Sequence, residues 1–230
     1  MPLVWGENRP GMQAGAPISR GREFLGRFLW RALGHLALFV SALLDRLGVH
    51  KQIVNRVTEP WSHITAIVTG TDAAFANFYA LRRHPAAEPT IHALADAMAA
   101  AHRASHPREL RGGQWHLPFV SDAEHAGLLT DTDALVHSVA RVARVSYDKP
   151  DGKIASFEED RALCKRLLES VPMHASPAEH QACATDYPPS ARGLAGCFGD
   201  SSGWIQYRKT LQGECSTTPL VIAFTEEKKP

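Results

Sequence analysis

The stretch A-R-V-S-Y-D-K-P-D-G-K-I-A-S-F-E-E-D-R-A-L-C-K-R-L-L-E-S-V-P-M-H-A-S-P-A-E-H, residues 143–180, decides how this chain is interpreted. Its middle predicts a helix, because Ser156 and Glu159 have the spacing of a capping box that satisfies two free backbone N–H groups. Residues that can carry chemistry flank this helix, A-R-V-S-Y before it and H-A-S-P-A-E-H after it. The stretch therefore predicts one helix with a polar segment at each end.

Outward from this stretch, helical periodicity dominates the chain. Apolar spacing, caps and stop signals predict six helices. The first begins after Ser19 and ends before Gly48, the second covers Gln52–Val57, and the third begins after Thr71 or Asp72. The fourth begins at Pro89, the fifth covers Leu135–Val145, and the sixth runs from Ser156 to Leu168. Strands are expected at Ile64–Val68, Trp204–Tyr207 and Leu220–Phe224. The fold class predicted is therefore α+β, mainly helical with a small antiparallel sheet.

The composition is that of an ordinary soluble globular protein. Hydrophobic residues make up 44% of the 230 residues and charged residues 21%. This length predicts a single domain over residues 1–230, with an irregular arm at 1–18 and a charged tail at 226–230. The formal net charge of +1 gives no reason to expect a nucleic-acid groove or an anionic membrane surface as partner.

The strongest apolar stretch runs from Phe24 to Leu47 and is interrupted by Arg27, Arg31, His35 and Asp45. The uninterrupted part, Leu36 to Leu44, is far shorter than the ~20 apolar residues that a membrane span needs. We expect a buried helix here, no membrane association and a cytoplasmic protein. The four cysteines form no C-x-x-C pair, so reduced thiols are expected, with disulfides as the alternative.

Two segments of the first half carry candidate binding residues. Arg56 lies four residues before Pro60, and an arginine there is suited to a phosphate because its planar fork donates two parallel hydrogen bonds. N-F-Y-A-L-R places Asn77 and Arg82 on one predicted helix. An asparagine amide can both donate and accept hydrogen bonds, which suits the polar edge of a bound ring. Ordinary solvated side chains are the alternative for all three residues.

His174, Ser176 and Glu179 form a junction between a loop and a helix. Pro177 after Ser176 is typical of a cap followed by the first helical residue, which leaves backbone N–H groups free to hold an anion. A plain structural cap is one alternative. A zinc site on His174 and His180 is another, although a zinc H-x-x-E-H motif has three residues from its first histidine to the glutamate and here the gap is five.

These motifs resemble segments of the flavin-dependent thymidylate synthases. A-R-V-S-Y with H-x-S-P-x-E-H resembles the flavin-contacting part of that family, N-F-Y-A-L-R resembles its N-F-x-x-L-R segment, and the segment ending at Arg56 resembles its G-V-x-R-E-x-A-R-x-x-L-P segment. The resemblance implies reductive methylation of dUMP to dTMP with FAD, NADPH and methylenetetrahydrofolate, in a homotetramer. It assigns FAD to Asn77, Ser146, His174, Ser176 and Glu179, and dUMP to Arg56 and Arg82.

The chain departs from the family in two ways. N-F-Y-A-L-R precedes the other two motifs, so the order resembles a circular permutation of the common one. The family's signature R-H-R-x-x-S-x-N-E-x-S-x-R-Y has no counterpart here. Either that segment lies upstream of this sequence, or the chain is an inactive, oligomerising remnant that binds no flavin. Stretches around Trp5, Trp115 and Trp204 resemble a phage-type branch, and packing is the expected role of their tryptophans.

Overall fold

The computed structural model describes residues 1–10, 14–127, 130–145, 155–186 and 203–214. The chain divides into two compact units, which are described one at a time. One unit comprises Met1–Thr65 and Asp72–Pro107, and the other comprises Ala66–Thr71 and Arg108–Pro230. The single domain expected over residues 1–230 stays a prediction.

The first unit begins with an arm that forms no helix and continues into α1 (Arg20–Arg46). Ser19 is the N-cap residue with extended backbone, but its hydroxyl makes no capping hydrogen bond. The helix ends as predicted at Gly48, whose φ of +74° suits a glycine. There the Gly48 N–H donates to the Asp45 carbonyl and the Val49 N–H donates to the Leu44 carbonyl.

One face of α1 is covered by tryptophans. Gly26, Trp30 and Gly34 recur every fourth residue and so lie on one face of the helix. A Cβ atom added at Gly26 would lie 2.7 Å from the Trp5 ring. A Cβ atom added at Gly34 would lie 2.9 Å from the Trp61 ring. Glycine is therefore required at both positions. The Trp30 ring centre lies 6.5 Å from that of Trp5 and 5.7 Å from that of Trp61, so the three indoles form one cluster.

Two short elements complete this side of α1. They are α2 (Lys51–Arg56), at the expected place, and the 3₁₀ turn η1 (Glu59–Trp61). Val54 of α2 is buried, as is Ala37 of α1. Further along, α3 (Asp72–Arg82) and α4 (Pro89–Ala104) form a helical pair, also as predicted. Small residues, Ala95 and Ala99, are buried in α4.

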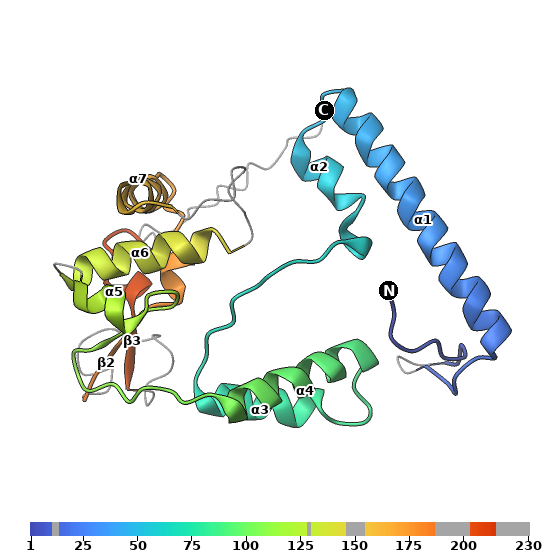
Figure 1. Ribbon diagram of the computed structural model, residues 1–230, viewed down its shortest axis with the longest axis horizontal. Helices are drawn as coiled ribbons and strands as arrows, with labels where there is room; N and C mark the ends of the chain where they lie inside the picture. The colour runs from blue at the N-terminus through green and yellow to red at the C-terminus, as the bar shows by residue number, and fades with distance from the viewer. Residues whose placement is uncertain (11–13, 128–129, 146–154, 187–202, 215–230) are drawn as a thin grey trace, which may run out of the picture. The chain divides into compact units, whose positions relative to one another are not determined.

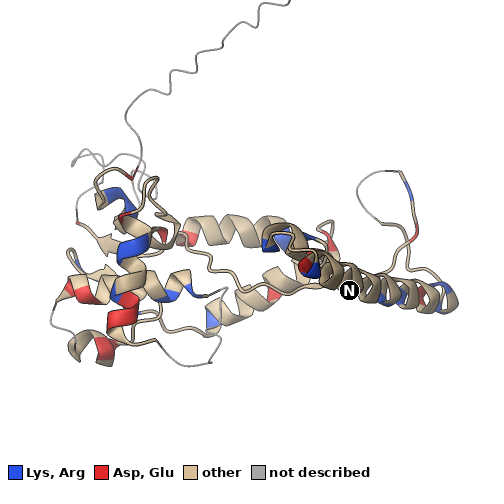
Figure 2. Cartoon of the chain, turned by 90° about the horizontal axis from the view of Figure 1, so that it is seen from above, with Lys and Arg blue, Asp and Glu red and all other residues tan. Residues whose placement is uncertain are grey.

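The rest of α1 is exposed, which corrects the expectation of a buried helix. Of its 27 residues, the structure buries only Gly34 and Ala37. In Figure 2 the charged residues of the long helix lie toward its ends, and the stretch between Arg31 and Asp45 carries none. Its large exposed side chains, 37% to 76% accessible, are Phe24, Leu25, Phe28, Leu29, Leu33, Leu36, Leu38, Phe39, Val40 and Leu43. By length and composition alone, α1 could cross a membrane.

The second unit is built around two helices that cross steeply, since in Figure 1 α6 (Asp131–Ala143) runs across the view and α7 (Phe157–Leu168) is seen end-on. The expected capping box is confirmed: the Ser156 hydroxyl accepts from the Glu159 N–H and the Glu159 carboxylate accepts from the Ser156 N–H. Val139 of α6, Cys164 of α7 and Ala178 form the core. The remaining helical elements are α5 (Asp122–Gly127), the 3₁₀ turn η2 (Ser176–Glu179) and the 3₁₀ turn η4 (Tyr207–Thr210).

The sheet of this unit is antiparallel, with the order β1 (Trp115–His116), β2 (Ala182–Ala184) and β3 (Trp204–Gln206). Trp115 lies opposite Cys183, and Cys183 lies opposite Ile205. The α+β class with a small antiparallel sheet is thus confirmed, and so is the strand at Trp204. The strands at Trp115 and Ala182 were missed, because two- and three-residue strands carry too little alternation to detect.

The strand expected at Ile64–Val68 is wrong. Among the described residues, the segment pairs with no strand, and Ile64 and Val68 are 83% and 64% exposed. A run of β-branched residues forms a strand only where neighbouring backbone accepts its hydrogen bonds and a surface covers its side chains. In the described part of the chain no strand lies beside this segment, and Ile64 and Val68 stay largely exposed. The expected strand at Leu220–Phe224 lies outside the described residues.

Candidate functional site

The centre of the second unit is a carboxylate with no access to solvent. Asp160, in the first turn of α7, is 0% exposed. One of its oxygens lies 2.6 Å from Nδ1 of His137, and the other accepts a hydrogen bond from Nη1 of Arg144. Nε of Arg141 lies 3.8 Å away. A buried carboxylate is tolerated only when cations and hydrogen bonds replace its water, and α6 supplies all three groups.

The sequence explains why these groups meet. His137, Arg141 and Arg144 are spaced by four and three residues, so they share one stripe of α6 and its C-cap. The capping box fixes where α7 begins and thereby places Asp160 in its first turn, where an acidic group also favours the helix dipole. Arg144 belongs to the A-R-V-S-Y motif, so the described start of this motif, residues 143–145, is bonded to the helix that follows it.

Arg141 links the same cluster to the surface. It donates to the Phe119 carbonyl and, at 2.8 Å, to the Glu124 carboxylate. The hydrogen bond from Arg141, together with those from Ser121, lowers the pKa of Glu124 to about 2. Glu124 is therefore ionised at neutral pH, and Arg141 is shared between two carboxylates.

The H-A-S-P-A-E-H segment lies on the other side of the core. Glu179 accepts a hydrogen bond from Nη1 of Arg208, whose Nε donates to Glu214 at 2.8 Å. The hydrogen bond to Glu214 and the pairing with Glu179 raise the pKa of Arg208 above its usual value. Glu179 is thus a neutralised carboxylate that keeps a second oxygen for a further donor.

His174 and Ser176 are exposed at the start of this turn. The expectation that Ser176 caps a helix is wrong, because Ala175 is the N-cap residue and Ser176 is the first residue of η2. The physical reason is the shortness of η2, a single four-residue 3₁₀ turn that ends at Glu179. It offers far less dipole to an anion than an α-helix does. The hydroxyl of Ser176 remains exposed and able to bind.

His180, which is partly buried, lies near His116 of β1. Nδ1 of His180 lies 2.9 Å from the Thr69 hydroxyl. Burial lowers the pKa of both histidines, and the neighbouring His180 lowers that of His116 further. Both rings are therefore neutral at physiological pH. In the part of the chain that the structure describes, no three His, Cys, Asp or Glu residues are grouped so as to hold a metal.

A buried amide adjoins this segment. Gln181 is 0% exposed, and its Nε2 donates to the Ser138 hydroxyl at 3.0 Å, which in turn donates to the Pro118 carbonyl at 2.8 Å. Its Oε1 has no hydrogen-bond partner among the described residues. Gln181 and Asp160 were missed by sequence reasoning. The only signal in the sequence was their position, since Gln181 follows the H-A-S-P-A-E-H motif and Asp160 follows the capping box.

The predicted nucleotide residues belong to the first unit. Arg56 ends α2, and Asn77 and Arg82 lie on α3, all three exposed. The structure places Ser176 and Glu179 on the turn η2 and His174 two residues before it, and it does not place them relative to Arg56, Asn77 or Arg82. Ser146 lies outside the described residues. On α3, Asn77 shares a stripe with Leu81 at a spacing of four, whereas Arg82 points away from that stripe.

Comparisons of the chain with protein-family models, with curated proteins and with solved structures find no match.

Proposed function

We propose that this chain is a flavin-dependent thymidylate synthase, which methylates dUMP reductively to dTMP with FAD, NADPH and methylenetetrahydrofolate. The observation that supports it is how the described parts of the two motifs, residues 143–145 and 174–180, contact α7. Arg144 of the first motif is bonded to Asp160 in the first turn of α7, and Ala178 of the second motif packs against Cys164 of the same helix. Two segments that resemble flavin-contacting motifs are thus held by one helix.

The residues present fit a flavin with a phosphate tail. His174, Ser176 and Asn77 offer exposed polar side chains, and Glu179 keeps one oxygen free beside Arg208. When bound, FAD supplies the hydride-carrying chemistry. The chain's own contribution is to bind and orient: Asn77 presents an amide to the ring edge, while His174, Ser176 and Glu179 hold the rest of the cofactor.

The nucleotide requires cationic donors that are not already used. Arg56 and Arg82 are exposed, and neither forms an ion pair with any residue that the structure describes. By contrast, the neighbouring Arg83 is bound to Asp96 at 2.6 Å. Arg56 and Arg82 thus keep their guanidinium forks available, which supports their assignment to dUMP.

Self-association belongs to the same proposal. We propose a cytoplasmic homotetramer in which the exposed apolar face of α1 packs against other copies of the chain. A row of exposed leucines and phenylalanines along 27 residues exceeds what a monomer leaves in water. The tryptophans that cover its opposite face are typical of a helix packed in protein.

The test is direct binding to the purified full chain. We expect visible flavin absorbance that co-purifies or is acquired on adding FAD, and saturable dUMP binding by calorimetry. Losing a charge-assisted hydrogen bond costs about 1.5–3 kcal/mol, so Arg82→Gln should weaken dUMP binding about 10- to 100-fold. Arg22→Gln, an exposed arginine on α1, is the matched control and should change nothing.

His174→Ala should weaken FAD binding in the same experiment, with His106→Ala, another exposed histidine, as its control. The inactive remnant is the second candidate, and the missing R-H-R-x-x-S segment favours it. A colourless protein that binds neither FAD nor dUMP would support the remnant and contradict the synthase.

A further inference from the structure

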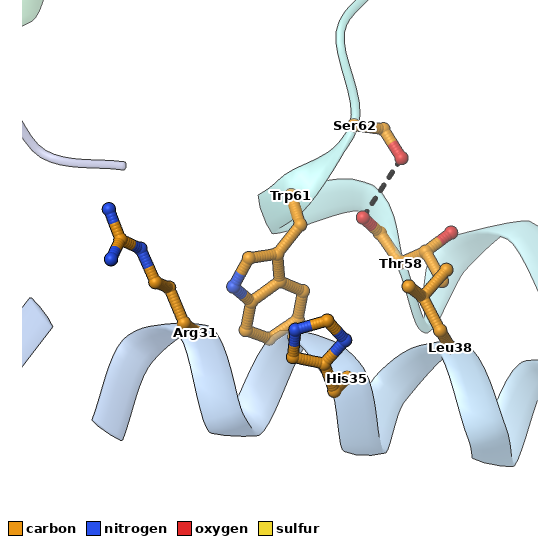
Figure 3. Close-up of a pocket in the computed structure, with 7 residues that line it drawn as sticks. Arg31, His35, Leu38, Thr58, Trp61 and Ser62 are labelled. Atoms are coloured by element: carbon orange, nitrogen blue, oxygen red, sulfur yellow. Dashed lines mark hydrogen bonds between the residues drawn. The ribbon is translucent and has the colours of Figure 1, made fainter. Parts of the chain in front are cut away.

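The first unit contains a pocket between α1 and η1 that the proposed synthase activity does not use. Its volume is about 250 Å³, and Figure 3 shows the Trp61 indole in its middle, above α1. The ring is fixed by a hydrogen bond from its Nε1 to the Trp30 carbonyl at 3.2 Å. Gly34 allows the ring to approach the helix this closely. The pocket therefore has a rigid aromatic wall.

One end of the pocket holds the guanidinium of Arg31. Arg31 lies on α1 one turn before His35, which also lines the pocket. Neither side chain forms a hydrogen bond or an ion pair with a residue that the structure describes. A guanidinium with a free fork matches the two oxygens of a carboxylate. This end accordingly favours a planar anion.

The opposite end offers only hydrogen-bond acceptors. The Thr58 hydroxyl donates to the Asn55 carbonyl at 3.0 Å, and the Ser62 hydroxyl donates to the Thr58 carbonyl at 2.9 Å. Figure 3 shows these two residues on one side of Trp61 and Arg31 on the other. Since both hydroxyl protons are used, the oxygens can only accept from a ligand. A ligand group at this end has to be a donor.

The volume and the apolar walls of the pocket limit which part of a ligand can lie between its two ends. The Trp61 ring lies in the middle of the pocket, and Leu38 lines it on the side of Thr58. Pockets for drug-sized ligands measure ~300–1,000 Å³, so this one is suited to a single ring. An aromatic ring can stack on an indole with an offset geometry that adds to its apolar burial.

We propose that this pocket binds a single-ring aromatic carboxylate that carries a hydrogen-bond donor at the far side of the ring. Arg31 binds the carboxylate, Trp61 stacks on the ring, and Thr58 and Ser62 accept from the donor. The site is independent of FAD and dUMP and goes beyond the proposed function.

The probe is 4-hydroxybenzoate, titrated into the ¹⁵N-labelled full chain while the indole N–H resonance of Trp61 is followed. Trp61→Phe assigns that resonance. We expect a saturable shift that Arg31→Gln weakens about 10- to 100-fold, the effect of losing a charge-assisted hydrogen bond. Arg46→Gln, an exposed arginine in the last turn of α1 outside the pocket, should leave the affinity unchanged.

Three related ligands test the parts of the proposal. 4-Hydroxybenzyl alcohol lacks the anion and should bind at least tenfold more weakly. 4-Methoxybenzoate lacks the donor and should bind about 2- to 12-fold more weakly, the effect of one neutral hydrogen bond. Ser62→Ala should reduce this preference for hydroxyl over methoxy, and because Ser62 is exposed, the variant is expected to fold.

The proposal is overturned if 4-hydroxybenzoate leaves the Trp61 resonance unmoved, or if the neutral alcohol binds equally well. It is also overturned if the Trp61 resonance moves on diluting the protein and none of the ligands competes, because a second copy of the chain then fills the pocket. Failure to bind FAD bears only on the synthase and leaves this result intact.

Discussion

Helices α1 and α6 differ in how much of their surface the described residues cover. α6 buries seven of its 13 residues inside its own unit, and even its histidine and serine there have partners. α1 is twice as long and buries only a glycine and an alanine. The comparison teaches that an apolar helix is stable only with a partner. The described residues provide that partner for α6, and for α1 they provide it only on the tryptophan side.

The largest expected effect concerns the partnered helix. Asp160→Ala should lower the free energy of unfolding by about 3–5 kcal/mol, because it removes the buried carboxylate to which Arg144 and His137 are bonded. Urea denaturation measures this loss. Glu169→Gln, which removes an exposed pair with Lys165, should change stability by no more than about 0.5 kcal/mol. Equal losses in both variants would show that the buried cluster does not hold α6 to α7.

The next effect concerns the unpartnered face of α1. Phe28→Glu places a charge among exposed apolar side chains and should weaken self-association about tenfold or more, as charges do at the centre of an interface. Analytical ultracentrifugation across a concentration series measures it. Val171→Glu, at a position 98% exposed in the second unit, is the control and should not alter assembly. An unchanged Phe28→Glu assembly would mean that another surface associates.

A smaller effect separates the two faces of α1. Gly34→Ala improves helix propensity by about 1 kcal/mol, yet its Cβ would lie 2.9 Å from Cδ1 of Trp61. Displacing that ring should outweigh the gain and destabilise the protein by about 1–3 kcal/mol. Gly21→Ala has nothing within 4 Å of its Cβ and should be neutral or stabilising. Thermal unfolding followed by circular dichroism compares the two variants. If both substitutions stabilise the protein, the Trp61 ring does not lie against Gly34.

The smallest expected effect depends on pH and tests the ion pair between Arg141 of α6 and Glu124. Arg141 and Ser121 lower the pKa of Glu124 to about 2, so its stabilising effect is present above the unfolded pKa of about 4.3 and lost as pH falls through 2. Because the side chain is 43% exposed, solvent screening limits the effect to at most about 1 kcal/mol. The stability difference between the wild type and Glu124→Gln should therefore shrink as pH falls from 5 to 2. A constant difference would contradict the pairing.

Much of the secondary structure was predictable because its signals are local. The capping box of Ser156 and Glu159, the stop at Gly48 and the opening of α4 at Pro89 each depend on residues within a few positions. The strand expected at Ile64–Val68 failed because strand formation depends on a distant neighbour. The shortness of η2 was likewise not encoded in the proline that opens it.

For the candidate site too, the sequence indicated residues that are close in the chain but not the contacts between distant ones. The sequence pointed to His174, Ser176 and Glu179 as a group, and the structure places Ser176 and Glu179 on the turn η2, with His174 just before it. It gave no sign that Arg208 neutralises Glu179, or that Asp160 would be the buried centre of the unit. Both facts depend on charges 29 and 16 to 23 positions away, which no local pattern relates.

By itself, the sequence determined where this chain is helical, which faces of its helices are apolar and which segments carry chemistry, because caps and periodicity act within about one helical turn. Only the tertiary structure decided which of those faces are covered. It covered α6 with α7 and one side of α1 with tryptophans, since burial depends on which distant residues fill the space beside a helix.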